Sequence, residues 1–314
     1  MHLPDGFLDA KTTAVTWALG AGGVAFAARH ASAAMPRERV PLVGLAAAFV
    51  FAAQMINFPV AGGTSGHLLG GVLVAALLGP GAAVIVLTAV LTLQCLLFAD
   101  GGVTALGANV VNMALVGTLG GWAVFRAFSA IVPGRAGRLA GVAVGSWTSV
   151  VLSATTCAGQ LAGSGTVRWG IAFPAMAGIH AVIGLGEAAI AAMVWTAIAR
   201  ARPELVGSAA DSESRRSVAP LAALGLAVAL ALALFAAPFA CPWPDGLEKV
   251  AEILGFESRA SGALPVSPFP DYLFPGISSE RLATAAAGAL GTIVLFGVGV
   301  FLAWRLGART SRSR

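Results

Sequence analysis

The feature that most constrains this chain is a series of apolar segments long enough to cross a lipid bilayer. A hydrocarbon core about 30 Å thick requires roughly 20 apolar residues in a helix. Nine candidate segments are approximately residues 10–28, 40–56, 66–79, 81–98, 104–125, 139–160, 174–199, 218–237 and 282–304. Charged residues make up only 11% of the 314 residues, whereas soluble domains carry roughly 25%. The sequence therefore predicts an all-α polytopic membrane protein.

Lysine and arginine are distributed unequally between the two sides that these segments define. If the N-terminus lies outside, only five of the 19 basic residues are on the outer side. These five are Lys11, Arg168, Lys249, Arg259 and Arg281. The positive-inside rule therefore predicts an outer N-terminus and a cytoplasmic C-terminus, provided that the short segment 66–79 counts as a crossing. Because topology explains the basic charge, no nucleic-acid partner is expected.

A polar stretch at residues 203–217 separates two parts of the chain. Its composition, PELVGSAADSESRRS, is typical of a linker. We expect a body of about seven helices at 1–202, a cytoplasmic linker at 203–217, and a two-helix tail at 218–314. The tail contains an outer loop, residues 238–281, that is rich in proline and acidic residues.

The first two residues form a candidate metal chelate. The start MHLPDGFLD carries two acids and no basic residue before Lys11, which argues against a cleaved signal peptide. The Met1 amine, the amide nitrogen of His2 and its Nδ1 atom can bind one ion through a five-membered and a six-membered ring. Such nitrogen sets suit Ni(II) and Cu(II).

Two polar segments are predicted on the same side as His2. The loop 57–67 ends in Ser65-Gly66-His67, and its histidine is either a fourth metal ligand or a residue that starts a helix. Asn109 and Asn112 lie on one helix face. Their amides either support the metal ligands or join helices.

His180 and Glu187 lie two turns apart on the seventh predicted span. An ionisable residue inside a membrane is a functional candidate, because its burial is expensive. These two residues define the alternative function, an ion-coupled secondary metal transporter with a proton relay. Gln54 and Gln94 are weaker cases. The sequence contains neither a Walker-type ATPase motif nor an HExxH metalloprotease motif, so no enzymatic activity is expected.

Three separated motifs resemble the CbiM/NikM family, which comprises the substrate-binding components of energy-coupling factor (ECF) ABC transporters for cobalt and nickel. They are the opening MHLPDGFLD, the loop PVAGGTSGHLLGG and the segment QCLLFADGGVTALGANVVNM. This resemblance implies that Met1, His2 and His67 hold the metal. Ser65, Asn109 and Asn112 are candidates for supporting residues. The resemblance also implies that the transported ion is Ni(II) or Co(II), and it implies no prosthetic group. Protonation of His2 and His67 should weaken binding at acid pH.

The tail resembles a second component of the same systems, because residues 244–248 match its PDGLE motif. The resemblance implies a natural fusion located in a prokaryotic cytoplasmic membrane. It also implies three partners, a transmembrane coupling subunit and two cytosolic ATPases, in addition to membrane lipid. The acidic residues Asp245, Glu248, Glu252 and Glu257 are expected to form a solvated face that attracts cations weakly.

Overall fold

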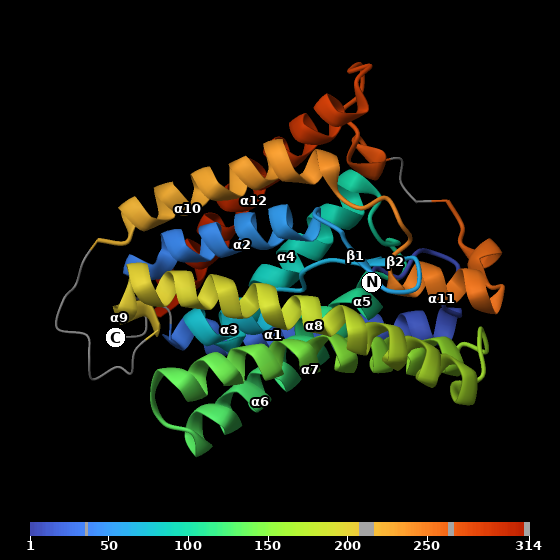
Figure 1. Cartoon of the computed structure of the whole chain (residues 1–314), viewed down its shortest axis with the longest axis horizontal. Helices are drawn as coiled ribbons and strands as arrows, with labels where there is room; N and C mark the ends of the chain where they lie inside the picture. Colours follow the sequence, from blue (N-terminus) through green and yellow to red (C-terminus); the bar gives the residue numbers. More distant parts are fainter. Residues whose placement is uncertain (35–36, 207–216, 263–266, 311–314) are drawn as a thin grey trace.

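The computed structural model describes residues 1–34, 37–206, 217–262 and 267–310, and most of these residues are helical (Figure 1). The helices are α1 (Ala10–Ala34), α2 (Val40–Gln54), α3 (Gly71–Leu78), α4 (Pro80–Phe98), α5 (Leu106–Asn109), α6 (Thr118–Ile131), α7 (Gly134–Gly163), α8 (Trp169–Ala201), α9 (Pro203–Val206), α10 (Ala219–Ala231), α11 (Gly246–Leu254) and α12 (Glu280–Thr310). The π-helical stretches Val110–Gly117 and Leu232–Ala236 extend α5 and α10, and 3-10 turns lie at Arg37–Arg39, Ala237–Phe239, Glu257–Arg259 and Pro270–Tyr272. Strands β1 (Phe58–Val60) and β2 (Thr64–Gly66) form one short antiparallel hairpin.

Six helical runs in the described residues are long and apolar enough to cross a membrane. They are Pro80–Phe98, Leu106–Ile131, Gly134–Gly163, Trp169–Ala201, Ala219–Phe239 and Glu280–Gly307. Every segment predicted from the sequence contains a helix, although α3 is much shorter than a span. The prediction of an all-α, multi-pass membrane protein with a seven-segment body and a two-helix tail is confirmed.

The third predicted segment crosses the body only partly as a helix. The Gln94 side chain donates to the Gln54 side chain at 2.9 Å, so the carboxyl ends of α2 and α4 lie together. The chain between these helices must therefore return to the opposite end of the bundle. Because α3 has only eight residues, the extended residues before it make up the rest of the return path. This extended stretch is the one that carries His67.

Glycines allow the tail helix α12 to pack closely against α2. A Cβ atom placed on Gly44 would lie 2.7 Å from the Phe296 carbonyl, and one on Gly299 would lie 2.8 Å from the Gly44 Cα. Small residues at such crossings let membrane helices approach through their backbones. The tail consequently lies against the body, and its loop reaches the end of the bundle where the N-terminus is buried (Figure 1). Residues 207–216 of the predicted linker lie outside the described residues.

Candidate metal site

The first residues of the chain fold into the body. Leu3 is fully buried, and its amide donates to Asn109 Oδ1 at 2.8 Å. The Leu3 carbonyl accepts from Asn109 Nδ2 at 3.1 Å and from the Gly102 amide at 2.8 Å. Asp5 accepts from the amides of Val103 and Thr104. The Asp100–Asn109 region therefore supplies the partners that fix the N-terminal segment.

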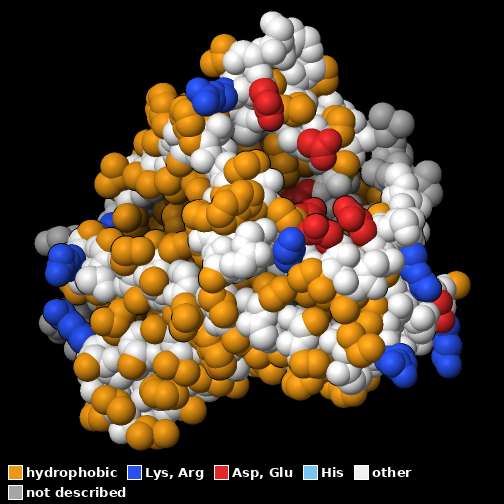
Figure 2. Space-filling model, turned by 45° about the vertical axis from the view of Figure 1, so that its right-hand side comes forward, with side chains coloured by type: hydrophobic (Ala, Val, Ile, Leu, Met, Phe, Trp, Pro, Cys, Tyr) orange, Lys and Arg blue, Asp and Glu red, His pale blue; other side chains and the backbone are white. Residues whose placement is uncertain are grey.

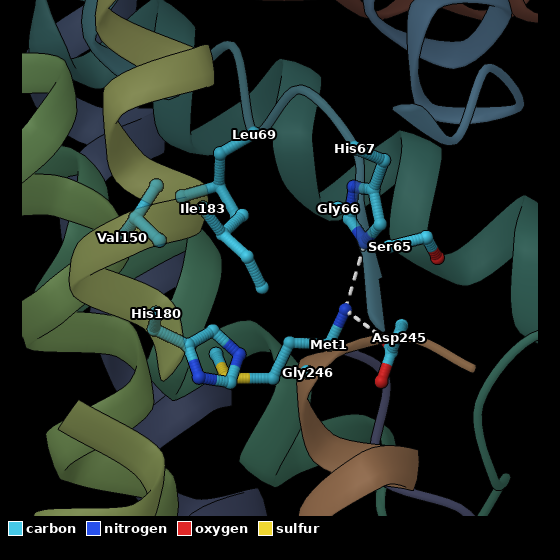
Figure 3. Close-up of a pocket in the computed structure, with 10 residues that line it drawn as sticks. All are labelled: Met1, Ser65, Gly66, His67, Leu69, Val150, His180, Ile183, Asp245 and Gly246. Carbon is cyan, nitrogen blue, oxygen red and sulfur yellow. Dashed lines mark hydrogen bonds and ion pairs between the residues drawn. The ribbon is translucent and has the colours of Figure 1, made fainter. Parts of the chain in front are cut away.

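The Met1 amine lies between a histidine of the body and a carboxylate of the tail (Figure 3). It donates to His67 Nε2 at 2.7 Å and forms an ion pair with Asp245 Oδ2, also at 2.7 Å. The side chains of Met1 and Asp245 are only 5% and 14% exposed. In Figure 3 the Met1 side chain extends from this point towards His180.

The hydrogen bonds of His67 orient its ring for ligation. Its Nδ1 atom lies 3.1 Å from the Leu68 carbonyl, which can only accept, so Nδ1 carries the proton. The lone pair of Nε2 therefore faces the Met1 amine. Metal–nitrogen bonds of about 2.0–2.1 Å at right angles would separate two adjacent donors by roughly 2.8–3.0 Å. The separation of 2.7 Å between the two nitrogens thus suits a shared ion as well as a hydrogen bond.

His2 lies beside His67 but is engaged elsewhere. Their rings are stacked, with centroids 5.4 Å apart. Nδ1 of His2 is 3.1 Å from Asp100 Oδ1, and Nε2 is 3.2 Å from Gln94 Oε1. Burial lowers the pKa of His2, although Asp100 acts in the opposite direction. A neutral ring has one N–H and can donate to only one of these two oxygens, and metal binding through Nδ1 requires it to leave Asp100.

Gln54 and Gln94 link His2 to the loop that carries His67. Gln94 Oε1 faces His2 Nε2, and Gln94 Nε2 donates to Gln54 Oε1. Gln54 Nε2 in turn donates to the Leu69 carbonyl at 3.1 Å. The two residues that the sequence marks as weaker candidates therefore connect the proposed ligands.

A small cavity of about 20 Å³ adjoins the Met1 amine. It is lined by Met1, Ser65, Gly66, His67, Leu69, Val150, His180, Ile183, Asp245 and Gly246. This volume accommodates about one water-sized group. No group of three His, Cys, Asp or Glu residues in the described part of the chain has the geometry of a preformed metal site.

His180 and Glu187 have different surroundings and do not form a pair. His180 Nδ1 donates to the Met176 carbonyl at 2.8 Å, and its Nε2 has no hydrogen-bond partner. Glu187 accepts from the amides of Leu69 and Gly70 at 2.5 and 3.0 Å. Glu187 thus anchors the segment that follows His67, while His180 borders the cavity.

The predicted supporting residues divide into two groups. Asn109 holds the N-terminal segment through Leu3, and the Ser65 hydroxyl donates to the Trp243 carbonyl at 2.7 Å. The Asn112 amide instead pairs with that of Gln160, at 2.7 and 2.9 Å. Asn112 therefore joins two helices, the second of the roles considered for it.

Sequence reasoning missed the position of Asp245, which was expected on a solvated face. Asp245 Oδ1 instead caps α11 by accepting from the amides of Leu247 and Glu248, and Oδ2 reaches Met1. The tail loop docks on the body because the Ser65 amide donates to the Pro244 carbonyl at 2.8 Å. The Asp-x-x-Glu spacing is a capping signal, but no sequence pattern connects Asp245 to Met1.

A larger acidic hollow of about 640 Å³ lies beside the small cavity. Its carboxylates are Asp100, Asp245, Glu248, Glu257 and Asp271. Figure 2 shows acidic side chains gathered around a hollow in a largely hydrophobic surface. His67 and Asp245 line both spaces, so the hollow and the small cavity adjoin at the two partners of the Met1 amine.

Comparisons with known proteins identify the family of the chain. Residues 2–205 match the family model of the cobalt uptake substrate-specific transmembrane region, CbiM, and residues 219–308 match the PDGLE domain. An Archaeoglobus fulgidus protein, provisionally named fused nickel transport protein NikMN, is 36% identical over 306 residues, which cover 96% of this chain and 98% of that protein. A Haloquadratum walsbyi protein, provisionally named a metal transport protein, is 44% identical over 208 residues, 66% of this chain and 93% of its own length.

A solved structure is also similar to the chain. The crystal structure of a truncated transition metal transporter matches with a TM-score of 0.59 and 32% identity, over 64% of this chain and 99% of the other. These relatives are transport proteins and not enzymes. The chain belongs to the CbiM family of metal transport proteins, and it carries a PDGLE domain after the CbiM region.

Proposed function

We propose that this chain is the substrate-binding subunit of an ECF-type ABC importer for Ni(II) or Co(II). The observation that carries the proposal is the Met1 amine, which lies 2.7 Å from His67 Nε2 in a buried site. With the nitrogens of His2 close by, the chain offers the donor set that the family resemblance implies. The nickel transport name of a relative that covers almost the whole chain supports the same cargo.

The acidic hollow supplies the route of entry. Its carboxylates raise the local concentration of divalent cations by electrostatic attraction. An ion that enters loses water, displaces a proton from the Met1 amine, and takes His67 as a ligand. His2 then completes the chelate by turning from Asp100.

Uptake against a gradient needs partners in this proposal. The sequence holds no Walker motif, so we assign ATP hydrolysis to two cytosolic ATPase subunits. A transmembrane coupling subunit transmits the resulting conformational change to this chain. The N-terminal metal site faces outside and the C-terminus is cytoplasmic, as the distribution of lysine and arginine predicts.

A secondary transporter with a relay through His180 and Glu187 is the alternative. Both side chains are buried, at 2% and 1% exposure, which keeps this alternative open to test. Against it, Glu187 already accepts two backbone hydrogen bonds and His180 bonds within its own helix.

The decisive binding experiment compares the chain with its native N-terminus and a copy with residues added before Met1. We expect the native chain to bind Ni(II) or Co(II) tightly and the extended copy to lose this binding, because an extension converts the amine into an amide. The ion bound more tightly identifies the cargo. Equal binding by both would remove the N-terminus from the site.

A transport experiment separates the two mechanisms. Metal uptake by cells that express this chain should require coexpression of the coupling subunit and active ATPases. Uptake by this chain alone that collapses with the proton gradient would favour the secondary transporter.

A further inference from the structure

The tail places one carboxylate directly against the N-terminal amine. We propose that Asp245 is an oxygen ligand of the transported cation, so that the body and the tail build one shared metal site. This inference rests on the proposed function, because it assumes that the cation binds Met1 and His67.

The distances around Met1 suit an ion with ligands from both parts of the chain. The amine is 2.7 Å from both His67 Nε2 and Asp245 Oδ2. Metal bonds to carboxylate oxygen and to nitrogen both lie near 2.0–2.2 Å, which places adjacent ligands roughly 2.8–3.0 Å apart. The Asp245 oxygen therefore lies within a few tenths of an ångström of the distance expected for a neighbouring ligand of an ion bound to the amine.

The two oxygens of Asp245 have separate roles. Oδ1 accepts from the amides of Leu247 and Glu248, and the Glu248 side chain accepts from the Asp245 amide at 2.8 Å. This capping box fixes the carboxylate at the start of α11. Oδ2 is left to face Met1, so the orientation of the proposed ligand is set before any ion arrives.

Other contacts hold the loop in place without the Asp245 side chain. The Ser65 amide and hydroxyl donate to the Pro244 and Trp243 carbonyls, at 2.8 and 2.7 Å. The Cys241 amide donates to the Asn57 carbonyl at 2.9 Å. A change confined to the Asp245 carboxylate should therefore leave the loop docked, which makes its contribution to the metal measurable.

The net positive charge of the bound ion favours a carboxylate ligand such as Asp245. The amine and imidazole donors are neutral when they bind a metal, and loss of the His2 amide proton would cancel only one of the two positive charges. A buried charge without a partner is costly. In the described part of the chain, the ion pair of Asp245 is with the Met1 amine. When an ion replaces the ammonium proton, the carboxylate is in position to balance the remaining charge.

The test uses the full chain with its native N-terminus and the variant Asp245→Asn. Asparagine is a good N-cap residue, so α11 should keep its start. Glu252→Gln is the matched control, because it removes a carboxylate from the same helix at a side chain that is 55% exposed. Two quantities are measured: the affinity for Ni(II), and the X-ray absorption edge of bound Ni(II), which distinguishes planar four-coordinate nickel from higher coordination.

We expect Asp245→Asn to bind Ni(II) roughly tenfold more weakly or worse and to change the nickel edge, while Glu252→Gln matches the wild type in both. An unchanged edge in Asp245→Asn would overturn the proposal even if affinity fell, because the carboxylate would then act only as a counter-ion. If the variant cannot be purified, a planar four-coordinate edge in the wild type overturns it. Failure of the wild type itself to bind Ni(II) or Co(II) would instead refute the proposed function.

Discussion

His67 and His180 lie on two sides of Met1 in the same cavity. The two histidines differ in the secondary structure that carries them and in their hydrogen-bond partners. His67 is in the extended segment between β2 and α3, where its Nδ1 pairs with the Leu68 carbonyl and its Nε2 with the Met1 amine. His180 is inside α8 and bonds back to the Met176 carbonyl of the preceding turn, and its Nε2 is unpaired. Only His67 presents a lone pair to the amine.

This difference indicates why the fold favours His67 over His180 as the proposed ligand. The interruption of helix before α3 lets His67 approach the N-terminus, and Glu187 and Gln54 hold the following residues. His180 is fixed by a continuous helix, and Gly246 of the tail packs so closely that a Cβ atom there would lie 2.6 Å from the His180 ring. Four predictions test the comparison, from the largest effect to the smallest.

The substitution His67→Ala should have the largest effect, because it removes a direct donor. We expect Ni(II) affinity to fall by roughly a hundredfold or more, beyond the 10–100-fold typical of residues that only support ligands. Metal titration against a competing chelator measures the change. A loss of less than threefold would refute the assignment of His67 as a ligand.

The fold and the candidate ligands could be predicted to different extents. Apolar length alone located the membrane segments, because the bilayer imposes the same requirement on each of them. Met1, His2 and His67 were identified partly from their chelating chemistry and partly from motifs, and their contact in the structure is consistent with both. Metal binding by these residues stays a prediction.

The contact between Asp245 and Met1 could not be predicted from local patterns. It depends on the packing of α12 against α2 and on backbone bonds from the tail loop to Ser65. The choice between the two roles of Asn112 was likewise open, because its partner Gln160 lies on another helix. Contacts between distant segments depend on how the helices pack against one another. The spacing of residues within one segment does not predict this packing.

The substitution Glu187→Gln should weaken the support of His67. Two backbone amides donate to the two carboxylate oxygens, and glutamine has only one oxygen to replace them. An amide left unpaired in a buried site costs about 1–3 kcal/mol. We expect a lower unfolding temperature in detergent and a Ni(II) affinity reduced by roughly tenfold.

The control for this variant is Glu252→Gln, which alters an exposed ion pair with Lys249 and should change stability little. If Glu187→Gln instead keeps wild-type stability and affinity but abolishes proton-driven uptake, Glu187 is a relay residue.

Acid should destabilise the metal-free chain through His2. Burial lowers its pKa in the folded state from an ordinary value of 6.5, so the unfolded chain binds the proton more readily. The contribution of neutral His2 is complete above pH 6.5 and declines as pH falls, by at most about 1.4 kcal/mol per pH unit. The measurement is the unfolding free energy between pH 7 and pH 5, and His2→Gln should flatten its dependence on pH. A steeper decline in the variant than in the wild type would contradict this cause.

The substitution His180→Leu should have the smallest effect. Leucine removes the buried Nε2 that lacks a partner and gives up a bond to a carbonyl within the same helix, and replacing unpaired polar atoms by apolar ones is often nearly neutral. We expect Ni(II) affinity within about threefold of the wild type and stability within about 1 kcal/mol. Because His180 lines the cavity beside Met1, a tenfold loss of affinity would make it a ligand. The two histidines would then act as a pair around Met1.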